Sequence, residues 1–137
     1  MEKGFLHWKA DLITEFDPFE TGLGRFVKPD KGAFVGRDAL MRRHADGPRK
    51  QLVTLTVGAN RAPAPGGASL MSRDRVVGTV TSGDWGHRVG MNLAYAFVEP
   101  DWAVTGCGME LDLCGTRVPA TVIPPSPYEP EFTRMRA

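Results

Sequence analysis

The feature that most constrains the fold is a series of short apolar stretches, separated by turn residues, between about residue 49 and residue 124. The stretches are rich in β-branched residues and are bounded by Gly, Pro, Ser and Asp, which is typical of β-strands. The six expected strands have the sequences KQLVTLTVG, ASLMS, RVVGTVTS, MNLAYAFV, MELDLC and RVPATVI. Six short strands at this close spacing predict a mainly β domain, either a small barrel or a sandwich.

The order of apolar residues within a strand indicates which side chains are buried. Val53, Leu55 and Val57 occupy alternate positions of the first strand, so we expect them to share one face. The fourth strand, MNLAYAFV, is nearly all apolar, which suits burial on both faces or a place in a barrel wall.

The connections between strands carry their own signals. Residues 72–74, Ser-Arg-Asp, predict a turn that joins the second and third strands in a hairpin. The sequence SGDWGHRVG is predicted to be a loop because of its glycines. Pro119 cannot donate a backbone hydrogen bond, so its presence in the last strand indicates an edge strand or a bulge.

The part of the chain before the strands has a different pattern, with one short helix expected over residues 37–45. Gly36 is an acceptable residue before the first helical turn, and Gly47 can end the helix. Leu40 and Met41 are expected to face inward. The residues by themselves therefore indicate a small β-barrel domain with an N-terminal appendage that contains a short helix.

The composition excludes several classes of partner. The net charge is +1, so no electrostatic case exists for binding nucleic acid or a membrane surface. No apolar run approaches the roughly 20 residues of a membrane span, and the N-terminal sequence lacks the apolar core of a signal peptide. Cys107 and Cys114 are expected to be reduced thiols, at least one of them half-buried, in a cytoplasmic protein.

The sequence contains no complete catalytic set. Ser82, Asp84 and His87 lie in one short segment, but triad residues normally come from separate elements, and no nucleophile elbow is present. We expect Ser82 and Asp84 to cap backbone amides in a turn. His7, His44 and His87 are far apart without carboxylates at ligand spacing, so no metal site is expected.

The aromatic residues are mostly expected to pack rather than to bind a ligand. This applies to Trp85 and Trp102, whereas Trp8 has polar neighbours and is the best exception. The last segment, PPSPYEPEFTRMRA, has two interpretations. It forms a surface tail, or it docks onto another domain and lines a ligand cleft with Tyr128.

Four stretches resemble the glycine cleavage T-protein (aminomethyltransferase) family. PFETGL is similar to the family's P-x-E-x-G-L sequence, and KGAFVGRDAL is similar to its KGDFIGREAL sequence. VGTVTSGDWGHRVGMNLAYAFVEP resembles its G-x-V-T-S-G…L-A-x-x-Y-V region, and VPATVIPPSPYEP resembles its ending with P-x-Y-D-P. The matches follow the family's order over nearly the whole chain.

The resemblance implies a fold and a function. The barrel corresponds to the family's C-terminal domain, at residues 49–137. Residues 1–48 correspond to the end of the preceding folate-binding domain and a connector. The branch that it resembles most fuses this module to dimethylglycine or sarcosine dehydrogenases, which are oxidoreductases of one-carbon metabolism. In that branch an oxidised N-methyl amine transfers its one-carbon unit to tetrahydrofolate, and FAD is implied for a separate upstream domain.

The resemblance also implies that part of the enzyme precedes this chain. The family's pterin-binding Tyr-Thr-Gly-Glu motif, its catalytic Asp and an Arg before the Met-Glu-x-Gly sequence have no counterpart here. We therefore expect a C-terminal fragment whose partners are upstream domains of the same polypeptide, and folate. Alone, it is expected to hold no cofactor, to bind tetrahydrofolate weakly and to be inactive.

The resemblance places four residues of this chain near the folate, with the role of shaping and covering its site. They are Glu2, Trp8, Tyr128 and Arg134. No catalytic residue and no metal ligand is expected in the chain. Two alternatives remain: a stand-alone barrel that serves as a binding or scaffold module without catalysis, and a paralogue whose acceptor is not folate.

Overall fold

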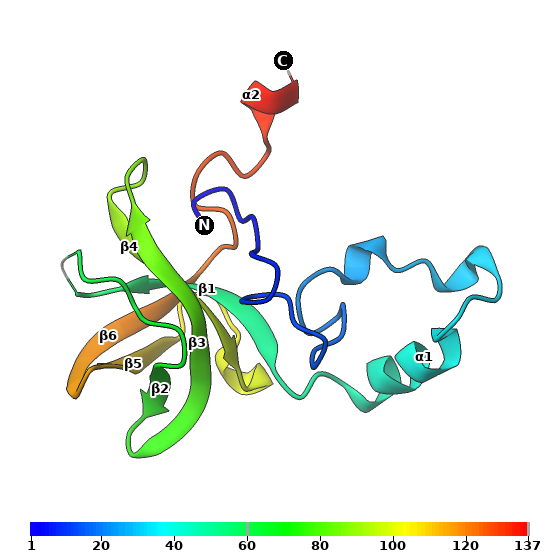
Figure 1. Ribbon diagram of the computed structural model, residues 1–137, viewed down its shortest axis with the longest axis horizontal. Helices are drawn as coiled ribbons and strands as arrows, with labels where there is room; N and C mark the ends of the chain where they lie inside the picture. Colours follow the sequence, from blue (N-terminus) through cyan, green and yellow to red (C-terminus); the bar gives the residue numbers. More distant parts are fainter. Residues whose placement is uncertain (60, 137) are drawn as a thin grey trace.

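The six predicted strands form a closed antiparallel barrel in the computed structural model, which describes residues 1–59 and 61–136. Around the barrel the strands follow the order β1-β4-β3-β2-β5-β6, and β1 closes the ring by pairing with β6 (Figure 1). The bounds are β1 (Gln51–Val57), β2 (Ser69–Ser72), β3 (Arg75–Gly86), β4 (Met91–Val98), β5 (Gly108–Leu113) and β6 (Thr116–Ile123). The predicted barrel is confirmed, and the sandwich is excluded because the sheet closes on itself.

The barrel interior is filled by alternate side chains of every strand. Val53, Leu55 and Val57 of β1 are buried, as their spacing predicts. They pack in one cluster with apolar residues of the other five strands, among them Leu70, Val77, Val80, Ala94, Ala96, Val98, Met109, Leu111, Ala120 and Val122.

Strand β4 is buried on both faces, as its continuous apolar sequence indicates. Ala94, Ala96 and Val98 belong to the interior cluster. Phe97, on the opposite face, stacks on Phe16 of the N-terminal segment, with 3.7 Å between the ring centroids. The N-terminal segment therefore covers the outer surface of the barrel at this strand.

The predicted loop SGDWGHRVG is wrong in its first half. Strand β3 continues to Gly86 and stays paired with β4, so only residues 87–90 form the turn. Glycine is required at position 83 for lack of space and not for a turn, because a Cβ there would lie 2.5 Å from the carbonyl oxygen of Ala64. The glycine permits close packing of the preceding connection against the strand.

Pro119 does not mark an edge, because β6 pairs with β5 on one side and with β1 on the other. The ladder between β1 and β6 ends at the pair Val57 and Ala120, so Pro119 lies just beyond it. There its carbonyl oxygen accepts a hydrogen bond from the amide of Gly58, at 2.7 Å. Pro119, which has no amide hydrogen to donate, therefore lies just outside the paired part of β1 and β6.

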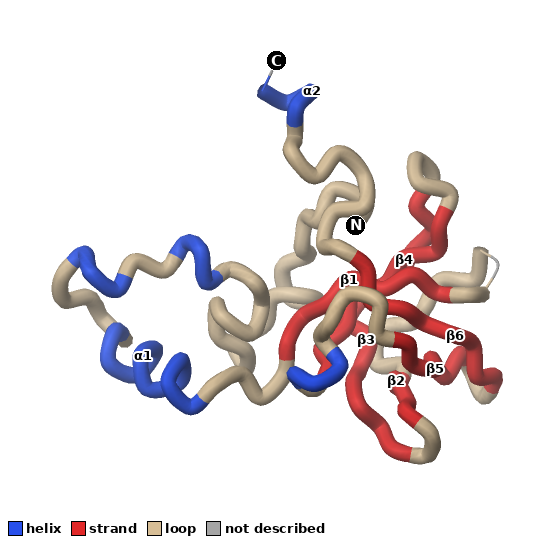
Figure 2. The backbone as a smooth tube through the Cα atoms, turned by 180° about the vertical axis from the view of Figure 1, so that it is seen from behind, coloured by secondary structure: helices blue, strands red, loops and turns tan. Residues whose placement is uncertain are grey.

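Residues 24–47 form an arm that projects away from the barrel (Figures 1 and 2). The arm contains the 3-10 helices η1 (Gly24–Phe26) and η2 (Pro29–Lys31) and the helix α1 (Arg37–Asp46), which confirms the predicted helix within one residue. Leu40 and Met41 are only half-buried, and α1 has no buried residue, so the expected inward packing is incomplete.

Two further helical segments lie outside the arm and, like η1 and η2, were not predicted. The 3-10 helix η3 (Pro100–Trp102) lies between β4 and β5, and the short helix α2 (Thr133–Arg136) lies in the segment expected to be a polar tail. No helix within the described residues has the length and apolar character needed to cross a membrane.

Candidate functional site

The N-terminus lies beside the barrel, next to the segment that leads to α2 (Figure 1). Between them is an open pocket of about 410 Å³, which we name the terminal pocket. Its lining consists of Met1, Glu2, Lys3, Phe5, Arg88, Tyr128, Glu129 and Arg134. Three of the four residues predicted to lie near a ligand, Glu2, Tyr128 and Arg134, are thus brought together.

Glu2 joins the three segments that line the terminal pocket. Its Oε1 atom accepts hydrogen bonds from the backbone amides of Arg88, at 2.5 Å, and Val89, at 3.0 Å, in the turn between β3 and β4. Its main-chain carbonyl oxygen accepts a hydrogen bond from the amide of Tyr128, at 2.9 Å. Glu2 therefore fixes the relative positions of the N-terminal segment, the turn and the C-terminal segment.

Tyr128 is surrounded by cationic groups. The Nζ atom of Lys3 lies 5.9 Å from its ring centroid, and the guanidinium carbon of Arg88 lies 5.8 Å from the same centroid. Its hydroxyl oxygen accepts a hydrogen bond from Nη1 of Arg134, at 3.0 Å. The ring is half-buried, so part of it remains open to the pocket.

Glu129 anchors the C-terminal side of the pocket. Its Oε2 atom lies 2.9 Å from Nζ of Lys3, and its Oε1 atom accepts hydrogen bonds from the amide of Arg134 and the hydroxyl of Thr133. The hydrogen bond from Lys3, followed by that from the Arg134 amide, lowers the pKa of the Glu129 carboxyl. The carboxylate thus ties α2 to the N-terminal segment.

The lining residues can bind and orient a ligand, but they do not provide a nucleophile paired with a base. The pocket combines three cationic side chains, two carboxylates and two aromatic rings, those of Phe5 and Tyr128. Such a surface suits a planar, polar ligand that stacks on a ring and carries negative charge. Both carboxylates are already engaged by amides or by Lys3, which favours a role in shaping the pocket over proton transfer.

Trp8 lies outside the terminal pocket. Its side chain is 64% exposed, and its backbone forms an isolated bridge with Leu12. Conversely, the pocket includes Lys3, Arg88 and Glu129, which sequence reasoning missed. Lys3 and Glu129 are sequence neighbours of predicted residues. Arg88 gave no signal, because its partner Glu2 is 86 residues away.

Ser82 takes part in a different arrangement from the one expected. It lies in β3 and donates a hydrogen bond to Oδ1 of Asp11, at 2.7 Å, and Thr81 donates to the same atom. The prediction that Ser82 caps a turn is therefore wrong. His87 is exposed and lies in the turn after the strand, so the segment holds no Ser-His-Asp arrangement.

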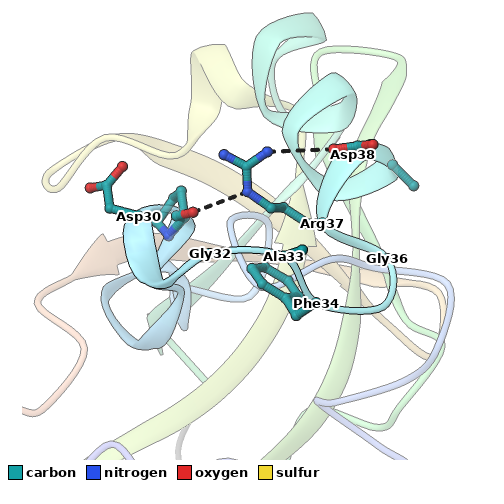
Figure 3. Close-up of a pocket in the computed structure, with 9 residues that line it drawn as sticks. Asp30, Gly32, Ala33, Phe34, Gly36, Arg37 and Asp38 are labelled. Atoms are coloured by element: carbon teal, nitrogen blue, oxygen red, sulfur yellow. Dashed lines mark hydrogen bonds and ion pairs between the residues drawn. The ribbon is translucent and has the colours of Figure 1, made fainter.

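A second pocket lies in the arm, between η2 and the start of α1 (Figure 3). Arg37 is its central side chain. The Nε atom of Arg37 donates a hydrogen bond to the carbonyl oxygen of Pro29, at 3.0 Å, and Nη1 lies 3.4 Å from Oδ1 of Asp38. None of the residues predicted to lie near a ligand lines it. The terminal pocket is therefore the better candidate site.

Neither cysteine is paired, with Cys107 half-buried and Cys114 exposed, as expected. No group of three or more metal-ligating side chains occurs within residues 1–59 and 61–136. The two cysteines lie on either side of β5, whose six residues separate them along the barrel wall.

Comparison with a family model identifies the barrel. Residues 50–129 match the model described as "Glycine cleavage T-protein C-terminal barrel domain". The chain is 35% identical over 124 residues to the mitochondrial dimethylglycine dehydrogenase of Mus musculus, which covers 90% of this chain and 14% of the relative. It is 36% identical over 124 residues to the aminomethyltransferase of Saccharopolyspora erythraea, covering 90% of this chain and 34% of that protein.

A solved structure shows the same architecture. The glycine cleavage system aminomethyltransferase T from Bartonella henselae superposes with a TM-score of 0.87 at 25% identity. The match covers 93% of this chain and 36% of that protein. The chain therefore spans between about one seventh and about one third of the length of these relatives.

Proposed function

Because this chain belongs to the glycine cleavage T-protein family, we propose that it forms the C-terminal part of a tetrahydrofolate-dependent aminomethyltransferase-like enzyme and helps to close the folate cleft. In this proposal the terminal pocket faces the folate. Tyr128 covers the ligand with its open ring face, and Arg134 orients that ring through its hydroxyl. Glu2 holds the lining segments in place. None of these groups transfers a proton.

The observation that carries the proposal is the convergence of predicted residues in one pocket. Glu2 and Tyr128 are at opposite ends of the sequence, yet they are joined by a main-chain hydrogen bond of 2.9 Å. The fit with folate is chemical: an aromatic ring suits stacking on a pterin or benzoyl group, and cationic side chains suit its carboxylates. Trp8 stays a predicted contact, which requires the ligand to extend beyond the pocket lining.

The remaining parts of the proposal concern the longer polypeptide. Residues 1–48 are the end of a folate-binding domain and its connector, and residues 49–137 are the barrel domain. The similarity to mammalian dimethylglycine and sarcosine dehydrogenases supports an upstream FAD domain and an N-methyl amine as the one-carbon donor. Those relatives are named as mitochondrial, and the cytoplasmic location of this protein stays a prediction.

Calorimetric titration of tetrahydrofolate into this chain tests whether tight folate binding requires the other domains of the enzyme. The proposal places the pterin-binding motif and the catalytic Asp on other domains, so no binding at micromolar affinity is expected. Formation of 5,10-methylenetetrahydrofolate from dimethylglycine or sarcosine is also expected to be absent. Micromolar binding or turnover by this chain alone would refute the proposal. Tight binding of an unrelated ligand would favour the stand-alone binding module.

A further inference from the structure

We propose that Tyr95 and Thr54 are positioning residues of the terminal pocket, because their hydroxyl groups hold its two lining segments on the barrel wall. The two residues lie directly opposite each other on neighbouring strands, Tyr95 on β4 and Thr54 on β1. Both are almost fully buried, with 2% and 3% of their surface exposed. A role of these two residues in folate binding rests on the function proposed for the pocket. The hydrogen bonds that they form do not depend on that function.

Tyr95 holds the N-terminal segment. Its hydroxyl group lies 3.0 Å from the carbonyl oxygen of Met1 and 3.4 Å from that of Phe5, so it can donate to either of them. These two carbonyls bracket residues 2–4, which include Glu2 and Lys3 of the pocket lining. Burial and the charge of Asp11 raise the pKa of Tyr95 to about 12, so the hydroxyl keeps its proton at neutral pH.

Thr54 holds the C-terminal segment. Its Oγ1 atom donates a hydrogen bond to the carbonyl oxygen of Pro125, at 3.3 Å, three residues before Tyr128. The two segments also touch each other at this place, because a Cβ on Gly4 would lie 3.0 Å from the same Pro125 oxygen. Gly4 has a φ of +75°, a conformation that glycine adopts readily.

The hydroxyl groups matter here more than the bulk of the side chains. Replacing Tyr95 by Phe or Thr54 by Val keeps nearly all the buried volume but removes one donor from a main-chain carbonyl. A carbonyl that loses its partner in a buried place turns towards water if the segment can move. The expected consequence is local loosening of residues 1–5 and 125–129 while the barrel stays intact.

Amide hydrogen exchange measured by NMR on this chain tests the inference. In Tyr95→Phe and in Thr54→Val, we expect the amides of Gly4 and Tyr128 to exchange about fivefold faster, since each lost hydrogen bond contributes on the order of 1 kcal/mol. The amide of Leu55, inside the barrel, should not change. Thr54→Ser restores the donor and should restore slow exchange.

Thr56→Val is the matched control, because Thr56 lies two residues further along β1 and opposite Thr121 instead of near Pro125. It should leave the exchange of Gly4 and Tyr128 unchanged. Unchanged exchange of both amides in Tyr95→Phe and Thr54→Val would overturn the inference. Faster exchange of Leu55 by the same factor would overturn it too, because it would indicate global destabilisation.

A second readout separates this inference from the proposed function. Tetrahydrofolate is added at millimolar concentration to the same variants, and its affinity is followed by ligand-observed NMR. Weaker binding to Tyr95→Phe and Thr54→Val than to Thr56→Val supports a positioning role, and equal binding contradicts it. If the unmodified chain binds no tetrahydrofolate, the proposed function fails, and the exchange rates still decide whether the hydroxyls hold the segments.

Discussion

Two buried carboxylates, those of Asp11 and Glu20, attach the N-terminal segment to the barrel through hydrogen bonds. Each has only 1% of its surface exposed. Asp11 accepts hydrogen bonds from the hydroxyls of Thr81 and Ser82 and from the amide of His7. A buried carboxylate is tolerated when its oxygens are hydrogen-bonded in this way.

Replacing Asp11 by Ala should lower the free energy of unfolding by about 2–3 kcal/mol, because buried donors on β3 and in the N-terminal segment lose their acceptor. Urea denaturation measures this change. Asp84→Ala is the control: Asp84 is exposed, and among residues 1–59 and 61–136 its carboxylate accepts only from the neighbouring amide of Trp85. Its effect should stay within about 0.5 kcal/mol. Equal effects of the two substitutions would contradict the assigned role of Asp11.

Glu20 should make stability depend on pH. Burial raises the pKa of its carboxyl, but hydrogen bonds from the Asp17 amide, the Arg49 side chain and the amides of Arg49 and Lys50 lower it below the ordinary value of 4.5. The folded-state pKa therefore lies below the unfolded-state pKa. The stability that this group contributes is fully present above about pH 4.5 and is lost as the pH falls through the folded-state pKa.

Denaturation of the chain between pH 7 and pH 3 tests this assignment. In Glu20→Gln, stability should fall less steeply with decreasing pH than in the unmodified chain. Glu129, whose pKa is also lowered, acts in the same direction in both proteins, so the difference between them isolates Glu20. Identical pH profiles would show that the Glu20 carboxylate does not contribute.

At the level of elements, the strands were predictable where burial imposes a period of two. Val53, Leu55 and Val57 of β1 show that period. The strands β5 and β6, which are joined by the turn after Leu113, show it as well. The end of β3 was not predictable, because Gly83 normally signals a turn. Its actual role, to admit the backbone of Ala64, depends on a connection almost 20 residues away in sequence.

Helix α1 and the barrel should differ in their share of the stability. Leu55 is fully buried, so Leu55→Ala should cost about 2–5 kcal/mol of unfolding free energy through lost burial and a cavity. Leu40 of α1 is half-buried, and alanine favours helices, so Leu40→Ala should cost less than about 1 kcal/mol. Chemical denaturation of both variants compares them. A larger cost for Leu40 would mean that α1 is part of the core.

At the level of the whole molecule, the chain consists of a barrel, a cover formed by its two ends, and a projecting arm. Glu2 and Tyr128 could be proposed from sequence because family resemblance points to them, whereas Arg88 could not. Its place in the pocket depends on the turn between β3 and β4 reaching the N-terminal segment. Such a contact follows from barrel closure and from no local pattern.

The arm should be the first part that a protease cuts. Trypsin cleaves after basic residues that are not followed by proline, and the arm contains five of them, Arg25, Lys31, Arg37, Arg42 and Arg43. None of its helices contains a buried residue, so local opening there is expected to require little free energy. Mass spectrometry of early digestion products should show cleavage within residues 24–47 before cleavage at Arg75 or Arg117 in the barrel strands. The reverse order would contradict this account.

The central claim is that the terminal pocket is the part of this chain that meets folate. Titrating tetrahydrofolate into the chain and recording amide chemical shifts by NMR tests it most directly. We expect weak binding, with a dissociation constant on the order of 1 mM and thus about −4 kcal/mol, because the rest of the cleft is absent from this chain. The shifts should be confined to residues 1–8, 87–90 and 126–134. No shifts at several times that concentration, or shifts centred on the arm or the far end of the barrel, would contradict the claim.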